Sequence, residues 1–86
     1  MKLVWHESAW VDYVWWQTQD RKILKRINAL LQDIDLHGNE GIGKPEALRH
    51  DFRGYWSRRI SEEHRLIYRV NEDEVRIVSC RYNYGR

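Results

Sequence analysis

An amphipathic segment in the first half of the chain constrains the fold more than any other feature of the sequence. From Asp20 onward, apolar side chains recur on one helical stripe: Ile23, Leu24, Ile27, Leu30, Leu31 and Ile34. This spacing predicts a helix that begins after Asp20, a good N-cap residue, and packs one face on a core. The opposite face is polar, and we expect its side chains to be solvated: Arg21, Lys22, Lys25, Arg26, Gln32 and Asp33.

Two shorter elements precede this helix. Residues 2–6 are compatible with a short β-strand. From Ser8, a reasonable N-cap, side chains recur again at helical spacing: Trp10, Tyr13, Val14 and Gln17. We therefore expect a strand followed by a first helix that starts at Ser8.

The periodicity changes after residues 36–44, which contain three glycines and are followed by Pro45. Such a segment ends a helix and forms a loop. Beyond it, residues 55–60, 65–70 and 75–82 alternate in polarity as strands do, with turn-like residues at 61–63 and 71–73. The predicted layout is β-α-α-β-β-β, an α+β fold with two helices packed on one face of a mostly antiparallel sheet.

Length and composition limit the class of protein. A chain of 86 residues supports one core, so we expect a single domain over residues 1–86. Cys80 is the lone cysteine, which excludes an internal disulfide and a cysteine-based zinc site, and we expect neither a metal nor a cofactor. No apolar run is long enough for a membrane span or a signal peptide. We expect a cytoplasmic protein without a membrane partner.

Positive charge is concentrated in the second half of the chain. Residues 44–86 hold ten Lys and Arg, nine of them Arg, against seven acids. If Leu66, Tyr68, Val70, Trp56 and Ile60 point inward, strand alternation turns another set outward: Arg65, Ile67, Arg69, Tyr55, Ser57 and Arg59. Guanidinium groups beside an aromatic ring are typical of surfaces that bind single-stranded RNA. A simply solvated face is the alternative, and charge alone does not decide between them.

Four segments resemble the YoeB toxins of the RelE superfamily: residues 43–48 (GKPEAL), 54–60 (GYWSRRI), 62–66 (EEHRL) and 80–84 (CRYNY). The similarity extends from Met1 to Tyr84. It implies a type II toxin that cuts mRNA in the A site of the 70S ribosome and so inhibits translation. It also implies a homodimer and a YefM-like antitoxin that holds the toxin inactive, with operator DNA bound only through the antitoxin complex.

Metal-independent RNA cleavage needs a base for the 2′-hydroxyl, positive charge at the phosphorus and an acid for the 5′ oxygen. The resemblance makes Glu46 the base and gives Arg65 the transition-state role, with Arg59 and Arg49 in support. Glu46 also follows the glycine-rich loop closely, near Lys44 and Arg49, where cations would keep it ionised. We expect the RNA phosphates to meet Lys44, Arg49, Arg59 and Tyr55. A solvated loop carboxylate is the alternative for Glu46.

The sequence departs from the family pattern at position 83. YoeB toxins usually read Arg-Tyr-His-Tyr, with the His as general acid, whereas this chain has Arg81-Tyr82-Asn83-Tyr84. An amide cannot donate a proton near neutral pH, and losing a general acid costs about 10²–10⁴-fold in rate. Either Asn83 is a natural variant, in which Tyr84, Arg65 or water protonates the leaving group, or it is a substitution introduced so that a toxic protein can be expressed. The sequence does not decide between these alternatives, and both allow an attenuated toxin. Tyr84 can also stack on a base or position a phosphate.

Strand alternation also predicts the direction in which the neighbours of these arginines point. His64 should face opposite Arg65 and serve as a buried or turn-anchoring residue, and Arg58 should point away from Arg59 with a structural role. Three tryptophans, Trp10, Trp15 and Trp16, exceed what one helical stripe can bury, so they either serve a dimer or another partner or pack in the core.

A second hypothesis is a catalytically weak or inactive toxin-like binding module that acts through the antitoxin, the ribosome or operator-DNA corepression. A generic RNA-binding domain is less favoured, because the net charge of +2 is too modest for strong binding of free RNA.

Overall fold

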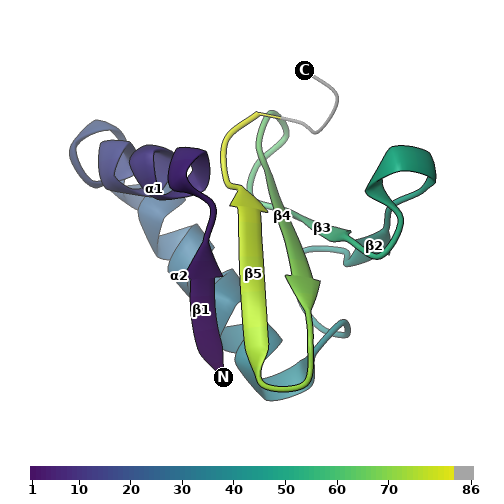
Figure 1. The fold of residues 1–86 in the computed structure, drawn as a ribbon. Helices are drawn as coiled ribbons and strands as arrows, with labels where there is room; N and C mark the ends of the chain where they lie inside the picture. Colours follow the sequence, from purple (N-terminus) through teal and green to yellow (C-terminus); the bar gives the residue numbers. More distant parts are fainter. Residues whose placement is uncertain (83–86) are drawn as a thin grey trace.

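The computed structural model describes residues 1–82 and contains two helices and a five-stranded sheet (Figure 1). The described elements are, in chain order, β1 (Lys2–Trp5), α1 (Glu7–Gln19), α2 (Arg21–His37), β2 (Glu46–Ala47), the 3₁₀ turn η1 (His50–Phe52), β3 (Trp56–Arg59), β4 (Arg65–Val70) and β5 (Glu74–Ser79). The strand order is β1-β5-β4-β3-β2, with β1 parallel to β5 and the other pairs antiparallel. The predicted α+β class is confirmed, and the two-residue strand β2 is added to the predicted layout.

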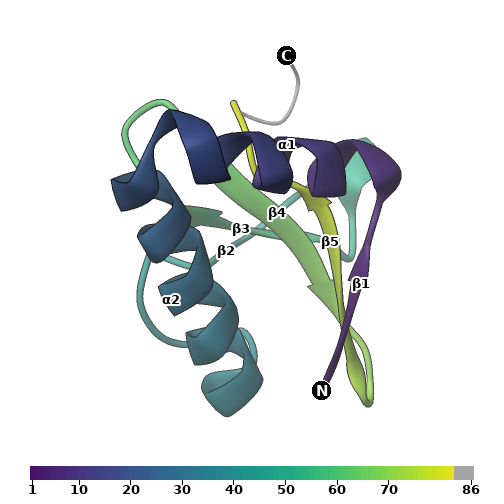
Figure 2. The ribbon, with the colours of Figure 1, turned by 90° about the vertical axis from the view of Figure 1, so that its left-hand side faces the viewer.

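Both helices lie on the same side of the sheet (Figure 2). The predicted apolar stripe of α2 faces it, with Ile27, Leu30 and Ile34 fully buried. On the sheet, alternate residues of β4 and β5 meet this stripe: Leu66, Tyr68, Val75 and Ile77. In the described part of the chain, no helix is long and apolar enough to cross a bilayer.

The two helix starts differ in how they are capped. Asp20 caps α2 as expected, because its Oδ1 accepts hydrogen bonds from the amides of Lys22 and Ile23 at 3.0 and 3.2 Å. The expected Ser8 cap is wrong. Helix α1 begins at Glu7 after His6, whose side chain makes no capping hydrogen bond. The reason is the sheet: the His6 amide still bonds to the carbonyl of Ile77, so the helix begins directly where strand pairing ends.

Two residues expected on the exposed face of the sheet are buried. Ser57 and Ile67 are only 6% and 1% exposed. They oppose each other on β3 and β4, which both have paired strands on either side. In the middle of a sheet, the side chains on both neighbouring strands shield a residue from water. Strand alternation therefore predicted which face Ser57 and Ile67 are on, but not how exposed they are.

Cys80 is fully buried, and its thiol lies 3.5 Å from the carbonyl oxygen of Ala9. Burial raises the pKa of the Cys80 thiol to about 12. The thiolate is the reactive form of cysteine, so Cys80 is a packing residue and not a nucleophile.

Candidate active site

The register of the sheet places the predicted site residues of β2, β3 and β4 on one face. Glu46 is opposite Ser57, and Ser57 is opposite Ile67. Directly opposed residues in an antiparallel pair share a face, and so do residues two apart on one strand. Arg59 and Arg65 oppose each other and lie two residues from Ser57 and Ile67. Glu46, Arg59 and Arg65 therefore share the face that the helices do not cover, which we call the arginine face.

The two arginines are an unfavourable pair in the absence of an anion. Like charges directly opposite each other on neighbouring strands are destabilising. Neither Arg59 nor Arg65 forms an ion pair with a carboxylate among residues 1–82. Guanidinium groups bind phosphate through two parallel hydrogen bonds. The pair is therefore suited to a phosphate that both side chains approach.

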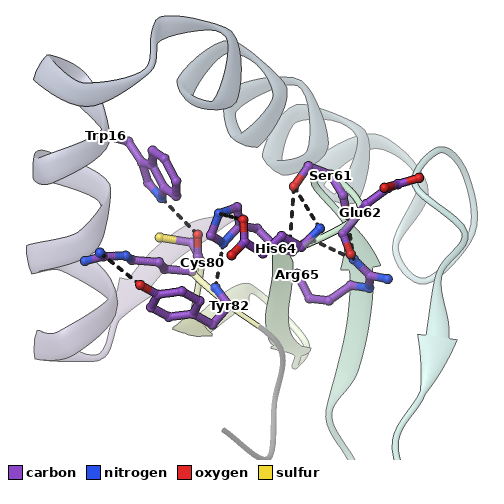
Figure 3. A network of polar contacts seen from close by, with 9 residues as sticks. Trp16, Ser61, Glu62, His64, Arg65, Cys80 and Tyr82 are labelled. Carbon is purple, nitrogen blue, oxygen red and sulfur yellow. Dashed lines mark hydrogen bonds and ion pairs between the residues drawn. The ribbon is translucent and has the colours of Figure 1, made fainter.

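Arg65 is held in place by the turn that precedes it (Figure 3). Its Nη1 donates to the carbonyl oxygens of Ser61, Glu62 and His64 at 2.6, 3.2 and 3.0 Å. Within the described residues, Nε and Nη2 have no hydrogen-bond partner. One nitrogen thus fixes the side chain, and the other two are available for an anion.

Glu46 lies beside an open hollow of about 510 Å³. The hollow is lined by residues 46–52, with the side chains of β2 at one end and the turn η1 at the other. Arg49 belongs to this lining and is exposed, whereas Lys44 lies in the preceding loop and does not line the hollow. The structure therefore brings Arg49, but not Lys44, into the same hollow as Glu46.

Tyr55 is half-buried and directly precedes β3. The guanidinium carbon of Arg69 lies 5.7 Å from the centroid of its ring, within the range of a cation–π contact. The combination of an aromatic ring and guanidinium groups that the sequence predicted on this side of the sheet is thus present.

Arg58 points to the opposite face, as expected, and is fully buried. Its five guanidinium N–H groups all have acceptors: Tyr68 Oη, Asp33 Oδ2 and the carbonyl oxygens of Ile42, Gly38 and Glu40. The expectation that Asp33 is solvated is wrong, because its side chain is only 16% exposed and pairs with Arg58.

This network ties the glycine-rich loop to α2 and β3. The hydrogen bond from Arg58 holds the pKa of the Asp33 carboxyl below its usual value, and burial raises the pKa of Tyr68. The loop also passes very close to α2. A Cβ on Gly43, which has φ +81°, would lie 2.7 Å from Leu30 Cδ2. Because the loop leads directly into β2, the network fixes the backbone from which Glu46 projects.

His64 is 8% exposed and lies on the other side of β4 from the Arg65 guanidinium, as predicted (Figure 3). Its ring meets Trp16 of α1 edge to face, with 4.9 Å between centroids. Trp16 in turn donates from Nε1 to the carbonyl of Cys80 at 3.0 Å. The predicted strand 75–82 ends at Ser79, because Cys80 and Tyr82 turn to meet these side chains. The other two predicted catalytic positions, Asn83 and Tyr84, lie outside the described residues.

Sequence reasoning missed three features of the site. It did not identify Asp33, the carbonyl groups that surround Arg58, or the hollow between β2 and η1. A signal for the hollow was present in the sequence, because Arg49 and His50 are followed by the turn Asp51-Phe52-Arg53-Gly54. The left-handed backbone of His50, with φ 57°, was not predictable from its residue type. Among the described residues, no cluster of three or more His, Cys, Asp or Glu side chains could hold a metal ion.

Comparison with known proteins gives a consistent result over the whole chain. The family model described as a YoeB-like toxin of bacterial type II toxin-antitoxin systems matches residues 5–84. Toxin YoeB of Escherichia coli K12 is 52% identical over 84 residues, which cover 98% of this chain and 100% of that protein.

Solved structures are also similar to this chain. A YoeB/ParE toxin from Agrobacterium tumefaciens superposes with a TM-score of 0.94 at 44% identity, over 98% of this chain and 100% of that one. A YoeB chain from Staphylococcus aureus, described as a dimer, superposes with a TM-score of 0.92 at 46% identity over 98% of each chain. A chain of the heterotetrameric YoeB-YefM complex from the same organism has the same TM-score, identity and coverage.

The fold and these similarities place the chain among the toxins of bacterial type II toxin-antitoxin systems. Within that class, the chain belongs to the YoeB toxin family. The resemblance found in the four sequence segments is thereby confirmed.

Proposed function

We propose that this toxin is an endoribonuclease that cuts mRNA in the ribosomal A site by metal-independent acid–base chemistry. The observation that supports this most is the register of β2, β3 and β4, which puts one carboxylate and two opposed guanidinium groups on the same open face. Glu46 takes the proton of the 2′-hydroxyl, and Arg65 stabilises the charge that develops on the phosphorane, with Arg59 beside it. Arg49, Lys44 and Tyr55 hold the RNA on either side of the scissile phosphate.

The ribosome supplies what the open site lacks. A wide hollow and a net charge of +2 give little means of orienting a flexible RNA strand. Holding the mRNA in the A site fixes the scissile bond relative to the toxin and removes much of the entropic cost of alignment. We therefore propose that cleavage depends on the ribosome, inhibits translation and takes place in the cytoplasm.

A YefM-like antitoxin is the proposed inhibitor of this chain. A relative from Staphylococcus aureus is found in a complex with YefM. The arginine face is suited to an acidic segment that folds on binding and covers the site, because uncompensated guanidinium groups attract carboxylates. We propose that operator DNA is bound only by the toxin–antitoxin complex.

We further propose a homodimer, for which an aromatic groove beside β1 is the best-suited surface. The groove holds about 530 Å³ and is lined by Leu3, Trp5, Trp10 and Tyr13 among others. Trp10 is 48% exposed although its ring lies 5.6 Å from that of Trp5 and 5.8 Å from that of Tyr13. An aromatic cluster left half in water is typical of a surface that another protein covers.

Trp10→Lys is expected to weaken the dimer by about 30-fold or more, the effect of removing an aromatic hot spot. Sedimentation equilibrium over a range of concentrations measures this. Val11→Lys is the matched control, because Val11 is 59% exposed on the same helix but does not line the groove. If both variants dimerise like the unchanged chain, the groove is not the interface.

Asn83→His is expected to raise the cleavage rate by about 10²–10⁴-fold by restoring a general acid. The measurement maps mRNA 3′ ends on ribosomes stalled with a defined A-site codon, with the chain as given and the variant side by side. An equal rate for the two would mean that position 83 is not the general acid, and that another group protonates the leaving oxygen.

Asn83 itself favours a second candidate function. Without a general acid, the chain could act as a binding module that retains the antitoxin and ribosome surfaces but does not turn over. This alternative requires tight binding of a YefM-like antitoxin and of ribosomes, with no cut at any toxin concentration in the same end-mapping experiment.

A further inference from the structure

We propose that His64 is a positioning residue whose Nδ1 atom holds the backbone of Tyr82 beside Arg65, and so keeps Arg65 in place for catalysis. The inference rests on the proposed nuclease function, in which Arg65 acts on the scissile phosphodiester. It gives the buried histidine a specific chemical task beyond packing.

Two consecutive residues, His64 and Arg65, bind both backbone polar groups of Tyr82. The Tyr82 amide donates to His64 Nδ1 at 2.7 Å, and the Tyr82 carbonyl oxygen accepts from the Arg65 amide at 3.0 Å. The first hydrogen bond uses the side chain of residue 64 and the second uses the backbone of residue 65. Any movement of Tyr82 relative to Arg65 must therefore break at least one of them.

The imidazole that makes this contact is itself fixed. Its ring packs edge to face on Trp16, and its backbone amide donates to Ser61 Oγ at 3.1 Å. The same turn supplies the carbonyl oxygens that bind Arg65 Nη1. His64 and the Arg65 guanidinium are thus anchored to one short turn, and Figure 3 shows them extending from it in different directions.

The backbone of Tyr82 needs such an anchor. Its φ of 62° lies in the left-handed region, which a tyrosine seldom adopts without support from its surroundings. An extended backbone at Tyr82 would instead continue the direction of β5. The hydrogen bond to Nδ1 favours the turned backbone and so selects the direction of the chain at this point.

The contact defines the chemical state of the ring. Nδ1 accepts a hydrogen bond, so it carries a lone pair and the ring proton is on Nε2, which lies 3.6 Å from Glu63 Oε1. A doubly protonated imidazolium has no acceptor and cannot hold Tyr82. In this contact His64 therefore acts as a hydrogen-bond acceptor.

The test compares His64→Asn with His64→Leu. Asn places Oδ1 near the position of Nδ1 and keeps the acceptor, whereas Leu has the same branching without one. Two readouts are needed: hydrogen exchange of the Tyr82 amide in the free protein, and kcat and KM for mRNA cleavage on programmed ribosomes. We expect His64→Leu to exchange the Tyr82 amide about tenfold faster and to lower kcat about tenfold with KM little changed, and His64→Asn to retain most of both.

The outcomes separate this inference from the nuclease proposal. If His64→Leu matches the unchanged chain in both readouts, or if Asn and Leu are equally impaired, then the acceptor is not what matters and the inference is overturned. If the unchanged chain and Asn83→His both fail to cut mRNA, the nuclease proposal fails, and amide exchange alone then decides whether His64 holds Tyr82.

Discussion

Glu46→Ala and Arg65→Ala are each expected to lower mRNA cleavage on programmed ribosomes by about 10²–10⁴-fold. The first removes the base that takes the 2′-hydroxyl proton, and the second removes the guanidinium that meets the charge developing on phosphorus. If both act on one phosphodiester, the double variant should lose far less than the product of the two single losses, because residues that act as a unit are not additive. Single-turnover rates measured from labelled mRNA fragments give these values.

Arg76→Ala is the matched control for the loss of one positive charge. Arg76 lies on β5, where it forms an ion pair with Glu74 at 3.0 Å and opposes Arg69 of β4. Strand β5 pairs with neither β2 nor β3, the strands that carry Glu46 and Arg59. Replacement of Arg76 should change cleavage by less than about threefold, because exposed ion pairs contribute little. Losses that multiply fully in the Glu46 and Arg65 double variant would show that the two side chains do not meet at a single bond.

The parts of the fold that could be predicted depend on local interactions. The α2 stripe follows from apolar spacing alone, and Asp20 caps the helix with its own neighbours. Alternation likewise assigned Arg58 and Arg65 to opposite faces of the sheet, because the period of a strand is two whatever its surroundings. For the same reason, Arg59 and Arg65 could be placed on one face before their register was known.

The parts that could not be predicted depend on long-range contacts. Asp33 has the position of a solvated residue on α2, and only the return of the chain 25 residues later makes it the partner of Arg58. The strand β2 has two residues and no alternating pattern, and it exists because β3 provides an edge for it. The prediction that Ser8 caps α1 is wrong for a similar reason, because the hydrogen bond between His6 and β5 decides where α1 begins.

Arg58→Met is expected to lower the free energy of unfolding by about 3–5 kcal/mol, a large share of the total stability of a small domain. Methionine fills similar space but leaves five acceptors without their donor, three of them carbonyl oxygens of the glycine-rich loop. Urea denaturation followed by tryptophan fluorescence measures the change. Arg58→Lys should also destabilise, because an ammonium group cannot replace a planar fork with five donors.

Arg59→Met is the matched control for stability, since Arg59 is adjacent in sequence but exposed, and the expected change is within about 0.5 kcal/mol. Equal unfolding midpoints for Arg58→Met and Arg59→Met would contradict the structural role given to Arg58. The loop that Arg58 binds runs directly into Glu46. Arg58→Met should therefore also reduce cleavage at temperatures where the protein is still folded, because the carboxylate is no longer held in line with the two arginines.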